Sequence, residues 1–123
     1  MSKRAYIPDR GDIIRLNLGG TAGREFDGPH FALVISNIEF QRRTGLCIIL
    51  PTTSKERSEL GELTSKLPTI ENLKRDGWVL LHHVRSIDFR ERAASFAGRL
   101  TLGDKDHREF IDDLVDRLFS IVE

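Results

Sequence analysis

The chain has 123 residues with 19 basic and 19 acidic side chains, so its formal net charge is zero. A neutral chain is not expected to coat nucleic acid non-specifically, although it can still carry local basic patches. Its 39% hydrophobic and 31% charged residues are typical of a globular protein. A length of this order favours one domain, which we expect to span residues 1–123.

The sequence contains no sign of a membrane or secreted protein. Its longest apolar runs, at 31–35 and 46–50, fall far short of the roughly 20 residues that a spanning helix needs. No apolar stretch follows the first four residues, so no secretory signal is visible. The single Cys47 excludes an intrachain disulfide, and we expect it to be a small buried side chain. These features predict a cytoplasmic protein without a membrane anchor.

The first half of the chain reads as strands. Residues 12–18 alternate between apolar and polar side chains, which is typical of a half-buried strand. A glycine-rich loop over 19–29 follows, and loops of this length in small domains are often functional. The runs at 31–36 and 46–50 are continuously apolar and predict strands buried on both faces. Residues 38–43 between them are expected to form one helical turn.

The second half continues this pattern with shorter pieces. Residues 52–62 are polar and predict a loop, and 62–70 can hold an edge strand. The apolar run at 78–82 and the segment 96–100 predict two further strands.

The tail differs from the rest because its apolar residues recur at spacings of three and four. This spacing predicts an amphipathic helix, with Asp104 and Asp106 in its first turn, where acids complement the helix dipole. The segment 104–117 holds six acidic and three basic residues, so a phosphate-facing surface should lie elsewhere. The apolar positions are Phe110, Ile111, Leu114, Val115, Leu118, Phe119 and Val122. Many strands and one closing helix predict a mostly β fold, a small curled antiparallel sheet or barrel.

Polar side chains gather at three places where an apolar strand gives way to a loop. Such strand ends can meet at one edge of a sheet, where rigid strands hold residues that solvent reaches. The three groups are Arg24, Glu25, Asp27 and His30; Thr52, Thr53, Ser54 and Lys55; and His82, His83 and Arg85.

These polar groups could carry out one of three kinds of chemistry. No G-x-S-x-G motif supports a hydrolytic nucleophile. His82 and His83 are adjacent and would point to opposite faces of a strand, and there is no second cysteine, so we expect no metal. Cleavage of RNA through its own 2′-hydroxyl agrees better, since it needs only an acid, a base and donors to the phosphate oxygens.

Each of these residues also has a plainer interpretation. Arg24 and Glu25 can be a solvated loop pair, and His30 a polar residue at the start of a strand. Thr53 and Ser54 can be turn formers, because such hydroxyls bond their own backbone. The residues alone therefore indicate only a β-rich domain with a polar cleft.

Motifs in order along nearly the whole chain resemble those of the MazF/PemK (Kid) toxins of bacterial toxin–antitoxin pairs. No single motif is specific, but their order and spacing are. They are YIPDRGDII at 6–14, G-x-E-x-x-G at 23–28, ALVIS at 32–36, TGL at 44–46, LPTTS at 50–54, DGWVL at 76–80 and VRSID at 84–88.

The resemblance implies a strongly curved, SH3-like (CcdB/MazF-like) antiparallel sheet with a C-terminal helix, and a homodimer. It implies cleavage of single-stranded mRNA at short sequences without metal or cofactor. It also implies a cognate antitoxin whose acidic tail lies across the RNA groove. Single-stranded RNA suits a small protein, because unstacked bases can be read directly.

The chain departs from the family pattern at two positions. His30 stands where the family usually has a principal catalytic arginine, and His82 stands where it often has Asp or Asn. An imidazole can both donate and accept a proton near neutrality, which an arginine cannot readily do.

We therefore expect Arg24, Glu25, His30 and Thr53 to be catalytic. In this arrangement Arg24, Glu25 and His30 share the acid, base and charge-stabilising roles, and Thr53 contacts the scissile phosphate. Ser54, His82 and Arg85 are expected to bind the substrate.

Two alternatives remain open at this stage. One is a catalytically decayed module that binds RNA or an antitoxin without cleavage. The other is a CcdB-like gyrase poison, which the resemblance disfavours because such toxins use a terminal Trp and this chain ends at Ile121-Val122-Glu123.

Overall fold

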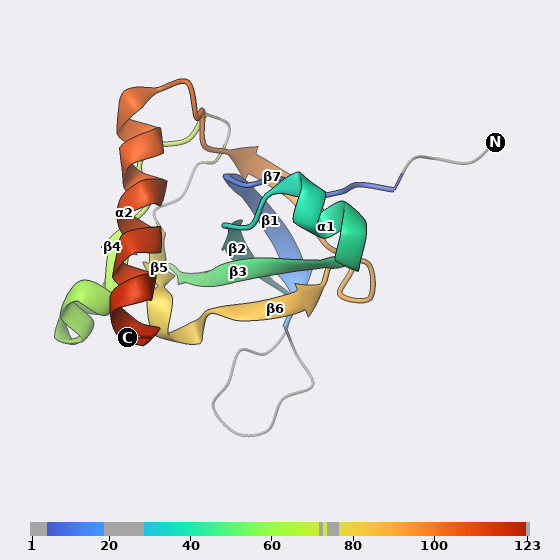
Figure 1. Ribbon diagram of the computed structural model, residues 1–123. Coiled ribbons are helices and arrows are strands. Elements are labelled where there is room, and N and C mark those ends of the chain that lie inside the picture. The colour runs from blue at the N-terminus through green and yellow to red at the C-terminus, as the bar shows by residue number, and fades with distance from the viewer. Residues whose placement is uncertain (1–4, 19–28, 72, 74–76, 123) are drawn as a thin grey trace.

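The fold is a seven-stranded antiparallel sheet with one long helix across it (Figure 1). The computed structural model describes residues 5–18, 29–71, 73 and 77–122. The strands are β1 (Asp12–Asn17), β2 (Pro29–Val34), β3 (Leu46–Thr53), β4 (Thr64–Lys66), β5 (Trp78–Leu80), β6 (Arg85–Asp88) and β7 (Ser95–Arg99). Six of them follow the order β4-β5-β3-β2-β1-β7, and β6 pairs with β3 off this path.

Strand β3 organises the sheet, because it pairs with three others. Its first half pairs with β6, where Cys47 lies opposite Ile87, and its last two residues pair with β5. Its other edge pairs with β2, where Leu33 lies opposite Leu50. Within the described residues β4 and β7 do not pair with each other, so the curled sheet is open rather than a closed barrel.

A short helix, α1 (Ile38–Thr44), connects β2 to β3, as the sequence predicted. The Asn37 side chain caps it by accepting a hydrogen bond from the Phe40 N–H at 2.9 Å. Gly45 ends it in the left-handed conformation, with φ of 73°, which a residue without a Cβ adopts at no steric cost. The helix thus returns the chain directly into β3.

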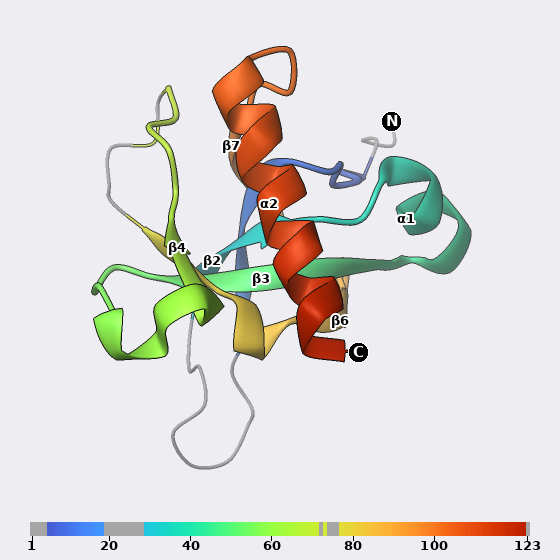
Figure 2. The same ribbon diagram turned by 60° about the vertical axis from the view of Figure 1, so that its left-hand side comes forward.

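The two faces of the sheet bury separate apolar clusters. Helix α2 (Lys105–Val122) crosses one face and contributes Ile111 and Leu114 (Figure 2). The cluster under this helix also contains Ile13, Leu33, Leu50, Ile70, Val79, Leu81 and Leu100. The opposite face buries Ile14, Leu16, Leu18, Ala32, Val34, Cys47, Ile49, Ile87 and Phe89. Strand alternation assigns each strand residue to one of these clusters.

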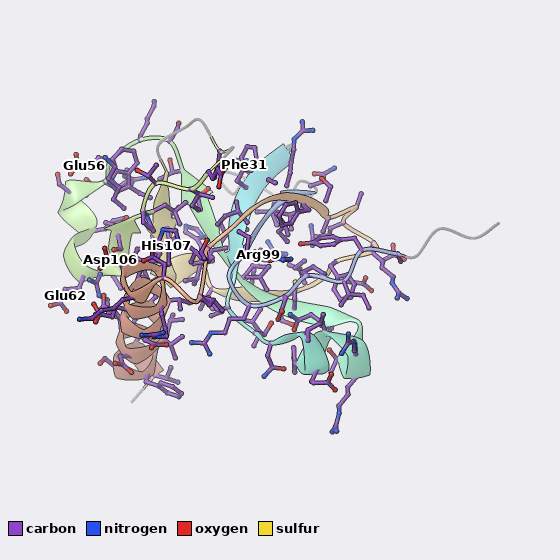
Figure 3. The ribbon with its side chains drawn as sticks, turned by 90° about the horizontal axis from the view of Figure 1, so that it is seen from above. Phe31, Glu56, Glu62, Arg99, Asp106 and His107 are labelled. Carbon is purple, nitrogen blue, oxygen red and sulfur yellow. The ribbon has the colours of Figure 1, made fainter. Side chains whose placement is uncertain are left out.

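Helix α2 confirms the amphipathic prediction, with one correction at each end. Asp104 lies just before the helix and caps it, accepting bonds from the N–H groups of Asp106 and His107 at 2.8 and 3.3 Å. Figure 3 labels Asp106 and His107 in the first turn of α2. Phe119 and Val122 were predicted to be on the buried stripe but are 64% and 79% exposed. Their turn lies beyond the cluster that Ile111 and Leu114 join.

Two predicted strands are shorter than expected. The segment 62–70 forms strand only at β4, after a 3₁₀ helix, η1 (Ser58–Leu63). Pro68 follows closely and lacks the N–H that would extend the ladder. The run at 78–82 leaves the strand after Leu80 and enters a 3₁₀ turn, η2 (Leu81–His83).

The predicted burial on both faces of β3 is also incomplete, since Leu46 is 36% exposed. A further result concerns membranes: none of the described helices is long and apolar enough to cross one.

Candidate functional site

The site predicted from sequence centres on the neighbouring ends of β2 and β3. Ala32 of β2 lies opposite Pro51 of β3, and strand alternation sets His30 on the face of Ala32 and Thr53 on the face of Pro51. His30 is also the register partner of Leu16 on β1. Since directly opposed residues share a face of the sheet, His30 and Thr53 face the same side as the buried Leu16.

Arg85 joins this face from β6. It lies opposite Ile49 of β3, which belongs to the cluster on the face away from α2. Trp78 of β5 lies opposite Thr53 and so also shares the face. The register therefore places His30, Thr53 and Arg85 on one side of the sheet, with an indole that the sequence analysis did not select.

The end of β3 is held by hydroxyl groups. Thr52 is buried and its Oγ1 donates to the Phe31 carbonyl on β2 at 3.0 Å, which fixes the two strands together. Thr53 Oγ1 accepts a bond from the Lys55 N–H at 3.3 Å, the turn-forming contact that the plainer interpretation anticipated. Its hydroxyl hydrogen can still be donated to a ligand. Ser54 is exposed in the turn that follows.

Residues 19–28 of the predicted glycine-rich loop lie outside the described residues. Arg24 and Glu25 lie outside the described residues, so their predicted roles stay predictions.

The two adjacent histidines differ from the prediction. They were placed on a strand, where their side chains would diverge. They lie instead in the 3₁₀ turn η2, with ring centroids 4.3 Å apart. The geometric reason given against a shared metal was therefore wrong. Within the described residues, however, no group of three or more His, Cys, Asp or Glu side chains is arranged to hold a metal ion.

Cys47 is confirmed as a buried core residue. Its exposed fraction is 0%, and burial raises the pKa of its thiol to about 12. The reactive form of a cysteine is the thiolate. A thiol that stays protonated in the core is not a nucleophile near neutral pH.

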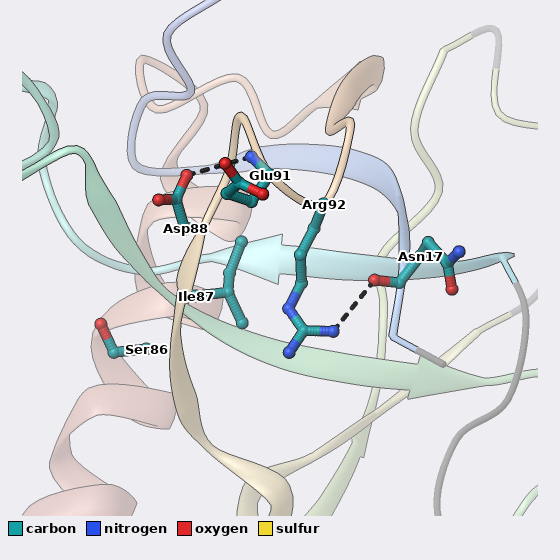
Figure 4. Close-up of a pocket in the computed structure, with 6 residues that line it drawn as sticks. All are labelled: Asn17, Ser86, Ile87, Asp88, Glu91 and Arg92. Carbon is teal, nitrogen blue, oxygen red and sulfur yellow. Dashed lines mark hydrogen bonds between the residues drawn. The ribbon is translucent and has the colours of Figure 1, made fainter. Parts of the chain in front are cut away.

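Two surface hollows at the end of β1 were not anticipated. Asn17 and Arg92 line both of them (Figure 4). The sequence contained one signal for these hollows, which is that Arg15 and Asn17 occupy the polar positions of the alternating strand. It contained no signal that Arg92, from the turn between β6 and β7, lies beside them.

Comparison with known proteins gives consistent matches over most of the chain. A family model described as PemK-like, MazF-like toxin of type II toxin-antitoxin system matches residues 9–110. The endoribonuclease toxin MazF of Escherichia coli K12 is 32% identical over 93 residues, 76% of this chain and 79% of that protein.

Solved structures agree with this match. The crystal structure of MazF (Form-I) from Deinococcus radiodurans has a TM-score of 0.78 at 30% identity, covering 96% of this chain and 98% of that one. A MazE-MazF structure (Form-III) from the same organism gives 0.73 at 28% identity, covering 95% and 97%.

Proposed function

We propose that this chain, which belongs to the PemK-like, MazF-like toxin family of type II toxin–antitoxin systems, is an endoribonuclease toxin that cleaves single-stranded RNA. The family match over residues 9–110 carries the proposal. The shared face of His30, Thr53 and Arg85 supports it, because three strands carry predicted site residues on one side of the sheet. A decayed binding module and a gyrase poison are not favoured by relatives named endoribonucleases.

The proposed reaction uses the RNA's own 2′-hydroxyl as nucleophile. A base removes its proton, the 2′-oxygen forms a bond to phosphorus, and the bond from phosphorus to the 5′-oxygen breaks. An acid gives a proton to the departing 5′-oxygen, which leaves a 2′,3′-cyclic phosphate and a 5′-hydroxyl. General acid and base groups typically contribute 10²–10⁴-fold each, and fixed donors stabilise the charge on the phosphate oxygens.

The residues can be assigned to these steps as follows. His30, Glu25 and Arg24 would share the acid, base and charge-stabilising roles. Thr53 would donate its hydroxyl to the scissile phosphate. The remaining predicted residues, Ser54, His82 and Arg85, would hold the substrate. His82 is exposed in η2, one turn before Arg85 enters β6, so both can be reached by a ligand.

We also propose that an antitoxin with an acidic tail inhibits the chain. A relative has been solved as a MazE-MazF structure, which supports a partner of this kind. Arg85 makes no ion pair with a carboxylate in the described part of the chain, so its charge is available to a polyanion.

Action on messenger RNA implies that the protein acts in the cytoplasm. The homodimer and the single domain over 1–123 stay predictions.

Incubation of the purified protein with a long single-stranded RNA in excess EDTA tests the proposal. We expect discrete fragments that carry 2′,3′-cyclic phosphate and 5′-hydroxyl ends. Replacing the 2′-hydroxyl by hydrogen at one mapped cut site should abolish cleavage there and leave the other sites unchanged. RNA that stays intact over a wide range of protein concentration and sequence would refute the enzymatic proposal, and cleavage at the 2′-deoxy site would refute its mechanism.

A further inference from the structure

One of the two hollows at the end of β1 is built from cationic and neutral polar groups. Its volume is about 180 Å³. The residues that line this hollow, here called the Arg15–Arg92 hollow, are Arg15, Leu16, Asn17, Arg92, Ala93 and Ser95. Two arginines, one asparagine and one serine are therefore among the described residues that line a single small space, and none of those described residues is acidic.

Neither arginine is neutralised by the described residues. Arg15 is exposed on β1 and forms no ion pair with a described carboxylate. Arg92 forms one described side-chain bond, from Nη1 to the Asn17 carbonyl oxygen at 3.3 Å (Figure 4). A guanidinium group carries five N–H donors and pairs strongly with anions, so two such groups with donors unused in the described structure favour an anionic ligand in this hollow.

Acidic residues line the neighbouring hollow, whose volume is about 390 Å³. Asp88 and Glu91 line that hollow together with Asn17, Ser86, Ile87 and Arg92. Asp88 is occupied within its own turn, since Oδ1 accepts the N–H groups of Arg90 and Glu91 at 3.1 Å each. An anion is therefore favoured on the Arg15 side of Arg92 and disfavoured on the other.

The backbone holds the two arginines in place before a ligand binds. Arg15 lies in β1 between Phe31 of β2 and Ser95 of β7. The turn that carries Arg92 is fastened to β1, because the Asn17 N–H donates to the Arg92 carbonyl at 3.2 Å. A site on such fixed elements loses little conformational entropy on binding.

We propose that the Arg15–Arg92 hollow binds a backbone phosphate of the RNA strand outside the bond that is cleaved. The inference rests on the proposed ribonuclease function and extends it to a second contact on the substrate. Guanidinium forks match phosphate oxygens, and the Ser95 hydroxyl adds a neutral donor. Arg15 and Asn17 point to the face opposite Leu16 and His30, so the hollow holds a flanking phosphate and not the scissile one.

The salt dependence of RNA binding tests this site without relying on cleavage. Single-stranded RNA of mixed sequence with 2′-O-methyl groups throughout lacks the 2′-hydroxyl nucleophile and stays intact. Its affinity is measured by fluorescence anisotropy at several salt concentrations, for the wild type, Arg15→Gln, Arg92→Gln and the double variant. Arg15→Lys keeps the charge, and Arg108→Gln removes an exposed arginine of α2 that is not among the residues described as lining the hollow.

We expect the double variant to lower the slope of log affinity against log salt by about 0.7, the value for one lost phosphate contact on a single strand, and each single Gln variant to lower it by a smaller amount. Arg15→Lys and Arg108→Gln should keep the wild-type slope. An unchanged slope in the double variant, or no binding of RNA at all, would overturn the phosphate site. Binding with the expected slopes but no cleavage of ordinary RNA would uphold the site and refute the ribonuclease proposal.

Two further arms separate the possible ligands. Inorganic phosphate at millimolar concentration should compete weakly and equally with all RNA sequences if the hollow recognises phosphate alone. An acidic peptide that loses affinity in the double variant, while RNA does not, would assign the hollow to a protein partner and overturn the proposal.

Discussion

The two ends of strand β1 carry polar groups of opposite kinds. At its start, Asp12 is fully buried, and its carboxylate accepts bonds from the Tyr6 hydroxyl at 2.6 Å, the Asp9 N–H at 3.0 Å and Arg99 Nε at 2.6 Å. At its end, Arg15 is exposed and no described carboxylate pairs with it. The Asp12 carboxylate is fully hydrogen-bonded within the protein, whereas Arg15 keeps N–H donors that can bind a ligand.

This difference separates structural polarity from functional polarity. A buried carboxylate is tolerated only when its hydrogen bonds are satisfied, so the Asp12 network ties the N-terminal segment and β7 to β1. Exposed cations contribute little to folding and remain available to a ligand. Substitutions at the start of β1 should therefore change stability, and substitutions near its end should change function.

The largest expected effect is on activity, from His30→Ala. Loss of a general acid or base should lower the rate of RNA cleavage about 10²–10⁴-fold, measured with a mapped substrate in EDTA. His30 is only half-buried, so the free energy of unfolding should fall by less than about 1 kcal/mol.

His30→Arg is the matched variant, because it restores the residue that the family resemblance leads one to expect. It should keep more activity than His30→Ala. Undiminished cleavage by the alanine variant would remove His30 from the mechanism while leaving the other residues in place.

The next largest effect is on stability, from Asp12→Ala. The variant leaves the Tyr6 hydroxyl and the Asp9 N–H without their acceptor, and each unsatisfied buried group costs about 1–3 kcal/mol. Urea unfolding should therefore show a loss of about 2–4 kcal/mol. Arg15→Gln, three residues along the same strand, should cost less than about 0.5 kcal/mol. Equal losses in the two variants would contradict the distinction between the ends of β1.

Tyr6→Phe should cost about 1 kcal/mol at pH 7, since it removes one hydrogen bond and keeps the ring. Burial, followed by the bond to Asp12, raises the pKa of Tyr6 above its ordinary value of 10.0. Above pH 10 the unfolded chain releases this proton while the folded chain keeps it, so this contribution to stability falls as the pH rises.

The measurement is the difference in unfolding free energy between the wild type and Tyr6→Phe at pH 9, 10 and 11. This difference should shrink above pH 10, at a rate of no more than about 1.4 kcal/mol per pH unit. Burial also raises the pKa of Cys47, from 9.0 to about 12, but both proteins contain Cys47 and its effect cancels. A constant difference would show that Tyr6 titrates normally.

Periodicity predicted the parts of the fold in which local pattern and packing agree. The alternation at 12–18, the continuous run at 46–50 and the spacing around Ile111 and Leu114 each report directly on a buried face. Periodicity failed where a few residues decide the backbone, as in the 3₁₀ turn at 81–83, because three residues carry no measurable period.

The candidate site was predictable only in part. His30, Thr53 and Arg85 were selected as residues at strand ends, and the register that places them on one face comes from pairings far apart in sequence. Asp12 and Arg99 are 87 residues apart, and Arg15 and Arg92 are separated by a similar length of chain. Neither pair could be found without the topology that sets β7 beside β1.

The smallest expected effect comes from Arg10→Gln, which probes a second contact near the start of β1. Arg10 Nη2 pairs with Asp112 Oδ1 of α2 at 3.1 Å, with the two side chains 35% and 59% exposed. Exposed pairs contribute about 0–1 kcal/mol and are screened by salt, so the loss should be near 0.5 kcal/mol and should vanish in 1 M NaCl. A double-mutant cycle with Asp112→Asn isolates the pair. A coupling above 2 kcal/mol that survives salt would mean that an exposed ion pair holds this end of β1 as firmly as the buried Asp12 network. Burial would then not distinguish the charged residues that stabilise this protein from those that are free to bind a ligand.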